Sequence, residues 1–203
     1  GIDLSSTQDL TAAVIVCVID GVFWWVPMFW TPAVGLRKKS EKDHVPYDVW
    51  HKEGWLRTTP GKAIDKDFVV SDIAAVRQEF GLRFVDVPFD KYRIEDLKAS
   101  CNRQGVTYEG QGAVLPMTDF QQGFISMGPA VDALEVALIA GTIRHDGNPC
   151  LRWNAANVVA ATDAAGNRKF DKSKATGRID GIVAGAMAHV RASQASMKQQ
   201  PKY

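Results

Sequence analysis

The 203-residue sequence has little cysteine, almost no net charge and no long uninterrupted hydrophobic run. Its three cysteines, Cys17, Cys101 and Cys150, are odd in number, widely spaced and form no C-x-x-C pair. This pattern argues against a disulfide framework or a zinc knuckle and favours a reducing cytosol as the compartment. The net charge of +1 gives no overall cationic field. Any binding of nucleic acid must therefore depend on local patches or on metal ions.

The most apolar stretch, residues 10–36, is long enough for a transmembrane helix, which needs about 20 apolar residues. Asp20 and Gly21 interrupt it between β-branched and aromatic runs. An Asp-Gly pair in that context predicts a hairpin of two buried strands. The sequence also carries no signal-peptide pattern, so we expect a protein that is neither membrane-bound nor secreted.

The composition, with 46% hydrophobic and 23% charged residues, is that of an ordinary globular protein. We expect one domain over residues 1–193 and a polar, flexible tail over 194–203. Periodicity and turn residues predict strands at 2–4, 10–19, 84–90, 106–111, 158–162 and 168–170. A further strand should begin at 22 and end between 27 and 32. The same signals predict helices at 47–52, 69–80, 94–101, 126–138 and 151–157, and one from Asp180. An antiparallel hairpin followed by alternating strands and helices is typical of a mixed α/β domain, with helices covering a central sheet.

Three aspartates occupy comparable positions in this arrangement. Asp3 lies in the first strand, Asp90 ends a later strand, and Asp180 begins the last long helix. Asp is disfavoured in strands, and a buried unpaired carboxylate is costly, so Asp3 needs a partner such as a metal ion. If the strands are neighbours, the three carboxylates converge at one sheet edge and can hold two Mg²⁺ or Mn²⁺ ions about 4 Å apart. For each acid taken alone, the pattern favours a turn-forming or capping role.

Five stretches resemble, in order, the nuclease domain of large terminase subunits from tailed double-stranded-DNA bacteriophages. The first, residues 1–12, begins Gly1-Ile2-Asp3-Leu4-Ser5-Ser6-Thr7. The others are 50–56 with 59–61, 89–92, 145–149 with 153–158, and 172–174 with 178–184. Together they span nearly the whole chain.

This resemblance implies an RNase-H-like fold and a metal-dependent endonuclease that cuts concatemeric viral DNA during packaging. Its catalytic acids fall on Asp3, Asp90 and Asp180. It further implies four partners: double-stranded DNA, an N-terminal ATPase motor of the same chain, the portal and the small terminase subunit. The implied location is the host cytoplasm, at the procapsid portal. No G-x-x-x-x-G-K-[ST] motif occurs, so these residues are not expected to bind ATP.

A basic segment precedes the third acid. We expect it to contact the DNA backbone beside the metal site through Arg168, Lys169, Lys172, Lys174 and Arg178. A solvated charged loop is the alternative for these residues. His145 is more typical of a structural turn residue than of a proton donor, and Asp9 fits either the site or a turn cap.

Two other functions remain open at this level. One is a different RNase-H-like nuclease, of the resolvase or transposase type. The other is a non-catalytic module that grips DNA or docks the motor onto a portal, with its acids serving only as structure. Because nothing in the sequence resembles a base-reading helix, any cutting should show little sequence preference.

Overall fold

The computed structural model describes residues 1–4 and 10–199. Its strands are β1 (Ile2–Asp3), β2 (Thr11–Ile19), β3 (Val22–Pro32), β4 (Arg57–Thr59), β5 (Val87–Asp90), β6 (Met117–Phe120), β7 (Ile143–His145), β8 (Ala160–Thr162) and β9 (Arg168–Phe170). Its helices are α1 (Leu36–Asp43), α2 (Tyr47–Lys52), α3 (Lys66–Glu79), the short 3₁₀ turn η1 (Lys91–Arg93), α4 (Ile94–Gln104), α5 (Phe124–Ile139), α6 (Pro149–Asn157) and α7 (Asp180–Gln199).

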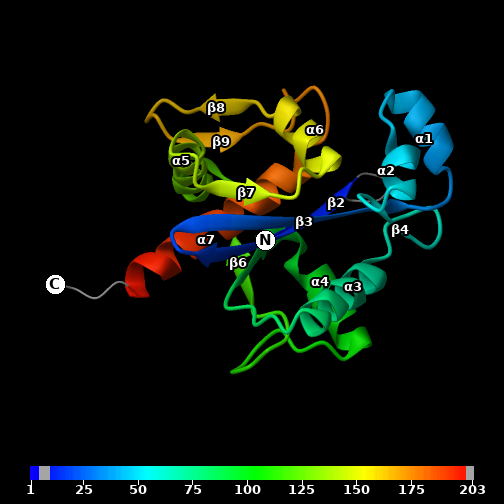
Figure 1. The fold of residues 1–203 in the computed structure, drawn as a ribbon, viewed down its shortest axis with the longest axis horizontal. Helices are drawn as coiled ribbons and strands as arrows, with labels where there is room; N and C mark the ends of the chain where they lie inside the picture. The colour runs from blue at the N-terminus through cyan, green and yellow to red at the C-terminus, as the bar shows by residue number, and fades with distance from the viewer. Residues whose placement is uncertain (5–9, 200–203) are drawn as a thin grey trace.

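A mixed sheet forms the centre of the molecule (Figure 1). In the described residues its strand order is β4-β3-β2-β1-β5-β6, and β7 also pairs with β3. The strands β1, β2 and β3 pair antiparallel, whereas β5 pairs parallel with both β1 and β6. The fold class predicted from the sequence, an antiparallel hairpin joined to parallel strands, is therefore confirmed.

The hairpin turns where the sequence predicts. Asp20 and Gly21 both have positive φ, 50° and 74°, which is the conformation that a tight two-residue β-turn requires. The long strands β2 and β3 that it joins run in register from Thr11 opposite Trp30 to Ile19 opposite Val22. The apolar stretch is thus a pair of sheet strands. Within the described ranges, no helix is long and apolar enough to cross a membrane.

Helices cover both faces of the sheet (Figure 1). The alternation of side chains along β2 divides the interior between the two faces. Ala12 and Val14 lie in one core with residues of α5, α6 and α7, whereas Ala13 lies in the other core with residues of α3 and α4. The small β8–β9 hairpin packs against α5, outside the central sheet.

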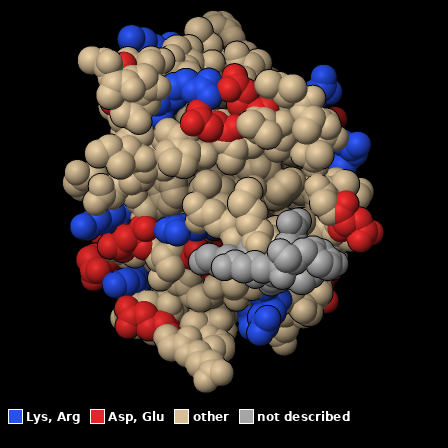
Figure 2. Space-filling model, turned by 90° about the vertical axis from the view of Figure 1, so that its left-hand side faces the viewer, with Lys and Arg blue, Asp and Glu red and all other residues tan. Residues whose placement is uncertain are grey.

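The surface carries charges of both signs in close proximity. On the face shown in Figure 2, basic and acidic side chains lie side by side, and wide areas carry neither. This mixture agrees with the net charge of +1. Attraction of a polyanion would therefore depend on individual basic positions rather than on a general field.

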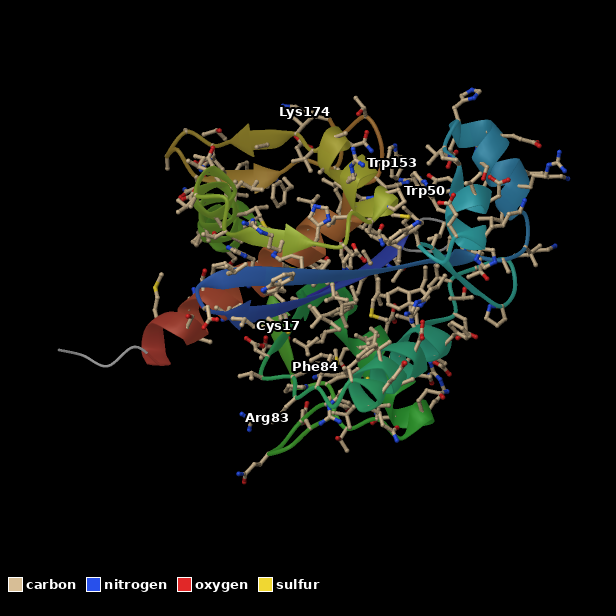
Figure 3. All side chains as sticks on the ribbon, viewed as in Figure 1. Cys17, Trp50, Arg83, Phe84, Trp153 and Lys174 are labelled. Atoms are coloured by element: carbon tan, nitrogen blue, oxygen red, sulfur yellow. The ribbon has the colours of Figure 1, made fainter. Side chains whose placement is uncertain are left out.

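Aromatic packing joins the peripheral helix α2 to α6. The rings of Trp50 and Trp153 lie 5.9 Å apart between centroids, and Tyr47 meets both rings edge-on or nearly so (Figure 3). Such pairs add about 0.5–1.5 kcal/mol beyond the area that they bury. They hold α6 in a fixed position on the sheet.

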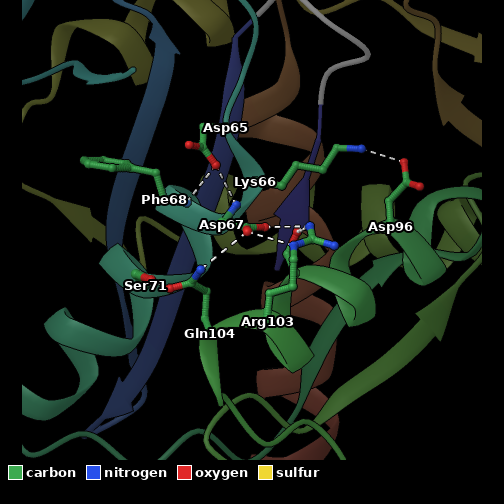
Figure 4. A network of polar contacts seen from close by, with 9 residues as sticks. Asp65, Lys66, Asp67, Phe68, Ser71, Asp96, Arg103 and Gln104 are labelled. Atoms are coloured by element: carbon green, nitrogen blue, oxygen red, sulfur yellow. Dashed lines mark hydrogen bonds and ion pairs between the residues drawn. The ribbon is translucent and has the colours of Figure 1, made fainter. Parts of the chain in front are cut away.

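Polar contacts join α3 to α4 on the opposite face (Figure 4). Arg103 makes paired hydrogen bonds of 2.6 and 2.8 Å to Asp67, and Lys66 lies 2.5 Å from Asp96. The side chain of Asp65 caps α3 by accepting from the N–H groups of residues 67 and 68. The two ion pairs are exposed, so they orient the helices and contribute little to stability.

Several element predictions need correction. The strand predicted at 106–111 is a loop; a glycine with positive φ interrupts it at 110, and two others flank it at 105 and 112. The strands β6 and β7 were not predicted, and the strand predicted at 84–90 begins only at Val87. The helix predicted from residue 126 begins earlier, at Phe124, with Gly123 at its N-cap.

The helix α1 was not predicted, whereas the other α-helices overlap the ranges that the sequence predicts. The C-terminal helix begins at Asp180, as predicted, but continues through Gln199, into the region expected to be a tail. The division into a domain at 1–193 and a tail at 194–203 stays a prediction.

Candidate metal and catalytic site

The first acid, Asp3, ends β1 in the middle of the sheet. Its side chain is 3% exposed. Ile2 pairs with Phe89 of β5, and both contribute to the core beneath α3 and α4. Since neighbouring residues in a strand point to opposite faces, Asp3 points to the face covered by α7.

The same register places Asp90 beside Asp3. Asp90 follows Phe89, so it lies opposite Asp3 on the adjacent strand, at a strand spacing of about 4.8 Å, and its side chain points to the same face. One of its carboxylate oxygens, Oδ1, accepts a hydrogen bond of 3.1 Å from the N–H of Tyr92 and so caps the turn η1. Asp90 therefore has a local structural role as well as a position at the site.

The third acid, Asp180, is the first residue of α7, and its side chain is 9% exposed. Its position depends on the neighbouring helix α6. The buried Asn154 accepts a hydrogen bond of 2.9 Å from the N–H of Gly181 and donates one of 2.9 Å to the carbonyl of Cys150. Asn157 donates to the carbonyl of Arg178 at 3.4 Å. These amides hold the start of α7, and with it Asp180, against the sheet.

Close packing fixes the start of α7 as well. A Cβ atom at Gly181 would lie 2.5 Å from the ring of Phe29, so a side chain at this position would push α7 away from the sheet. The residue that follows Asp180 therefore has to be small.

Lys172 joins the first and third acids. Its Nζ donates to Oδ2 of Asp3 at 2.6 Å and to Oδ1 of Asp180 at 3.1 Å. Gln122, which follows β6, donates to Oδ1 of Asp3 at 3.3 Å. The other oxygen of Asp180, Oδ2, is buried and makes no hydrogen bond within the described part of the chain.

The electrostatics follow from burial. Burial, opposed by Lys172 and assisted by the negative charge of Asp180, raises the pKa of Asp3 to about 6. Burial alone would lower the pKa of Lys172, but its attraction to Asp3 and Asp180 raises that pKa above its usual value. The ammonium of Lys172 is therefore charged at neutral pH and partly balances the buried carboxylates.

The structure thus brings Asp3 and Asp180 together directly and places Asp90 next to them by strand register. Among the described residues, no group of three His, Cys, Asp or Glu side chains is close enough to hold a metal ion. The chemistry of the donors nevertheless suits Mg²⁺ or Mn²⁺, because all three acids offer hard oxygen ligands. The unpartnered Oδ2 of Asp180 is an acceptor that a bound cation would satisfy.

The basic residues of the predicted DNA contact have different environments. Arg168 forms ion pairs with Asp132 and Glu135 of α5, at 2.5 and 2.7 Å. The ammonium of Lys169 lies 4.7 Å from the ring centre of Phe124.

The other three members of the basic segment either contact the acids or are exposed to solvent. Lys172 bridges Asp3 and Asp180, whereas the side chain of Lys174 is 67% exposed and lies at the outer edge of the molecule (Figure 3). Arg178, also exposed, is two residues before Asp180. The role of these five residues in binding DNA stays a prediction.

Two further residues, His145 and Asp9, were considered as members of the site. His145 ends β7, and its Nδ1 accepts a hydrogen bond of 3.0 Å from the N–H of Gly147, in agreement with the structural turn role that the sequence favours. Asp9 lies outside the described residues. The sequence did not single out Gln122 or the acid-bridging position of Lys172. Asn154 and Asn157 lie in one of the stretches that resemble the family, and this resemblance could have indicated that they support the site.

Comparison with known proteins gives consistent results. The family model for the terminase large subunit, endonuclease domain, matches residues 1–196. The terminase large subunit of Enterobacteria phage HK97 is 48% identical over 189 residues, which cover 93% of this chain and 36% of that protein. The terminase large subunit of Lactococcus phage SK1 is 26% identical over 192 residues, which cover 93% of this chain and 34% of that protein.

Solved structures agree with this result. The crystal structure of the HK97 bacteriophage large terminase matches with a TM-score of 0.85 and 46% identity, over 94% of this chain and 38% of that chain. The chain therefore spans little more than a third of the length of these proteins.

Proposed function

The chain belongs to the family of terminase large subunit endonuclease domains, and from this we propose that it is a metal-dependent endonuclease that cuts concatemeric double-stranded viral DNA during genome packaging. The observation that carries the proposal is the pair of buried carboxylates, Asp3 and Asp180, held about a single cation beside Asp90. Burying two like charges at one place is costly unless a cation balances them.

In this proposal the three acids hold two Mg²⁺ or Mn²⁺ ions. Asp3 would contribute to the binding of both ions, and Asp90 and Asp180 would complete their ligands. When bound, the ions supply the positive charge that a phosphodiester needs as water attacks it. The roles of the acids are supported by the oxygen-only donor set and by the buried Oδ2 of Asp180.

The basic segment would hold the DNA backbone. Lys174 and Arg178 are exposed on the segment that leads to Asp180, so phosphate groups bound there would lie near the acids. Backbone contacts of this kind orient DNA without reading its bases. We therefore expect cutting with little sequence preference.

The setting is also part of the proposal. The domain would act with an ATPase motor of the same longer chain, the portal and the small terminase subunit, in the host cytoplasm at the procapsid portal. The similarity to longer terminase large subunits supports this setting.

A plasmid-cleavage assay tests the proposal. With Mn²⁺, the protein should convert supercoiled plasmid to nicked and linear DNA, and Asp90→Asn should abolish this conversion. Loss of a partner outside the ligand shell of a metal costs about 10–100-fold, so loss of a direct ligand should cost at least as much. The matched control is Asp119→Asn, which removes the charge of an exposed acid. Asp119 pairs with Phe89, the neighbour of Asp90, so strand alternation directs its side chain to the opposite face of the sheet from Asp90.

Equal cleavage by Asp90→Asn and by the unaltered protein would place the chemistry elsewhere. If the folded protein does not cut at high concentration but still binds duplex DNA, it is a DNA-gripping or docking module instead. A strong preference for four-way junctions over linear duplex would indicate a resolvase-type nuclease.

A further inference from the structure

The ammonium group of Lys172 occupies the place between Asp3 and Asp180 where a shared metal ion would bind. Its Nζ lies 2.6 Å from Oδ2 of Asp3 and 3.1 Å from Oδ1 of Asp180. The two carboxylates are almost completely buried, whereas the side chain of Lys172 is 46% exposed. The acids of this ion-pair bridge are therefore shielded by protein, whereas the lysine side chain reaches them from the solvent side.

An ion held by the same two oxygens cannot share this place with the ammonium. Mg²⁺ binds carboxylate oxygens at about 2.0–2.1 Å, so it would take the position between them that Nζ now takes. Repulsion acts in the same direction, because two cations bound to the same pair of oxygens would lie very close together.

We propose that Lys172 is an internal competitor of the metal, which a divalent ion must displace and which then binds a phosphate group of the DNA. This inference rests on the proposed function. The displacement needs no movement of the backbone, because the lysine has a flexible four-carbon stem and its side chain is partly exposed to solvent.

The surroundings of Lys172 leave the released ammonium near the substrate. Its neighbour Asp171 accepts hydrogen bonds from the N–H and the hydroxyl of Ser173, at 3.0 and 2.6 Å, which fixes the turn from which Lys172 extends. Lys174 projects from the same turn into solvent. Binding of the metal would therefore add a second cation to the surface that meets the DNA backbone, and each ligand would strengthen the binding of the other.

The same site offers a competing arrangement. The buried Oδ2 of Asp180 has no hydrogen-bond partner in the described residues. An ion that used this oxygen together with Asp90 would leave the lysine bridge in place. In that case, metal binding would be independent of Lys172.

Calorimetric titration of Mn²⁺ into the protein without DNA separates the two arrangements. We expect Lys172→Met, which keeps the length of the side chain and removes its charge, to bind Mn²⁺ about tenfold more tightly than the unaltered protein, within the usual range of coupling between ligands. Lys172→Arg restores a cation that can bind both acids, so it should bind Mn²⁺ no more tightly than the unaltered protein. Lys174→Met, the matched control, should leave the affinity unchanged.

A second readout does not depend on the affinity. Without metal, Lys172→Met should unfold at a lower temperature than the unaltered protein, since it leaves two buried carboxylates without a cation. Mn²⁺ should then raise its unfolding temperature by more than it raises that of the unaltered protein. If Lys172→Met cannot be obtained folded, Lys172→Gln takes its place in both measurements.

Unchanged or weaker Mn²⁺ binding in the neutral variants would overturn the inference and favour the arrangement through Oδ2 of Asp180. That result would leave the proposed nuclease function intact. Absence of Mn²⁺ binding in every variant, the unaltered protein included, would instead overturn the proposed function.

Discussion

Asp3 should destabilise the protein at neutral pH when no metal is bound, so that Asp3→Asn is more stable than the unaltered chain. The pKa of Asp3 is about 6 in the folded protein, raised by burial from an ordinary value of 3.8. The difference corresponds to roughly 3 kcal/mol at 1.36 kcal/mol per pH unit. Because this pKa already includes the attraction of Lys172, the figure is the net cost of ionising the buried carboxyl.

The pH dependence of this cost has a definite sign. Between pH 4 and pH 6 the folded state binds more protons at Asp3 than the unfolded chain does, so stability decreases as the pH rises through this window. The full cost is present above the folded pKa. Asparagine resembles the protonated side chain, so the advantage of Asp3→Asn should be about 3 kcal/mol at pH 8 and fall below about 1 kcal/mol near pH 4.

Urea or thermal unfolding in EDTA measures this advantage. For a domain of this size, about 3 kcal/mol corresponds to an increase of about 6–12 °C in the unfolding temperature. Adding Mn²⁺ should stabilise the unaltered protein and leave Asp3→Asn unchanged, so the gap should narrow. The control Asp119→Asn, an exposed acid, should show no such gap at either pH. If Asp3→Asn is less stable than the unaltered protein at pH 8 in EDTA, the ion pair with Lys172 outweighs burial and the reasoning is wrong.

Three further predictions concern activity, packing and DNA binding. At subsaturating Mn²⁺, the single-turnover cleavage rate should fall as the pH drops below about 6, because burial holds the pKa of Asp3 near that value; a flat profile from pH 5 to 8 would exclude Asp3 from metal binding. Asn154→Ala should lower the free energy of unfolding in urea by about 1–3 kcal/mol, since it leaves the N–H of Gly181, in the first turn of α7, without a partner, and a change under 0.5 kcal/mol would contradict this role. Lys174→Ala should reduce the slope of DNA affinity against salt by about 1, whereas Arg168→Ala should change it less because two acids already pair with Arg168; equal losses would show that those ion pairs open on DNA.

The parts of the fold that depend on neighbouring residues were predictable from the sequence. The hairpin at Asp20 and Gly21 depends on two residues that tolerate positive φ between β-branched runs, and such a signal is purely local. The start of α7 at Asp180 and its apolar face are local in the same way. The strand β6 is different, because its four residues include the polar Thr118 and Asp119 and become a strand by pairing with β5. Tertiary pairing of this kind leaves little trace in a short segment.

The site shows the same division. Family resemblance predicted the three acids by their order along the chain, and strand register accounts for the nearness of Asp3 to Asp90. The contacts that complete the site join distant segments, since Asp3 meets Gln122 and Lys172 across 119 and 169 residues. No local pattern predicts which polar side chain will reach a buried carboxylate over such separations. Charge alone favoured a role for Lys172 in binding DNA and gave no sign of its contact with the acids.

The separation of 169 residues between Asp3 and Lys172 has a consequence for the chain during its synthesis. Ribosomes add about 5–20 residues per second. Lys172 and Asp180 are therefore synthesised on the order of 10 to 30 s after Asp3. Contacts between such distant segments form late, because the chain must first be ordered in between. A nascent chain that ends before residue 172 lacks both the lysine and Asp180. In the proposed nuclease, competence to cleave DNA would therefore arrive only with the completed domain.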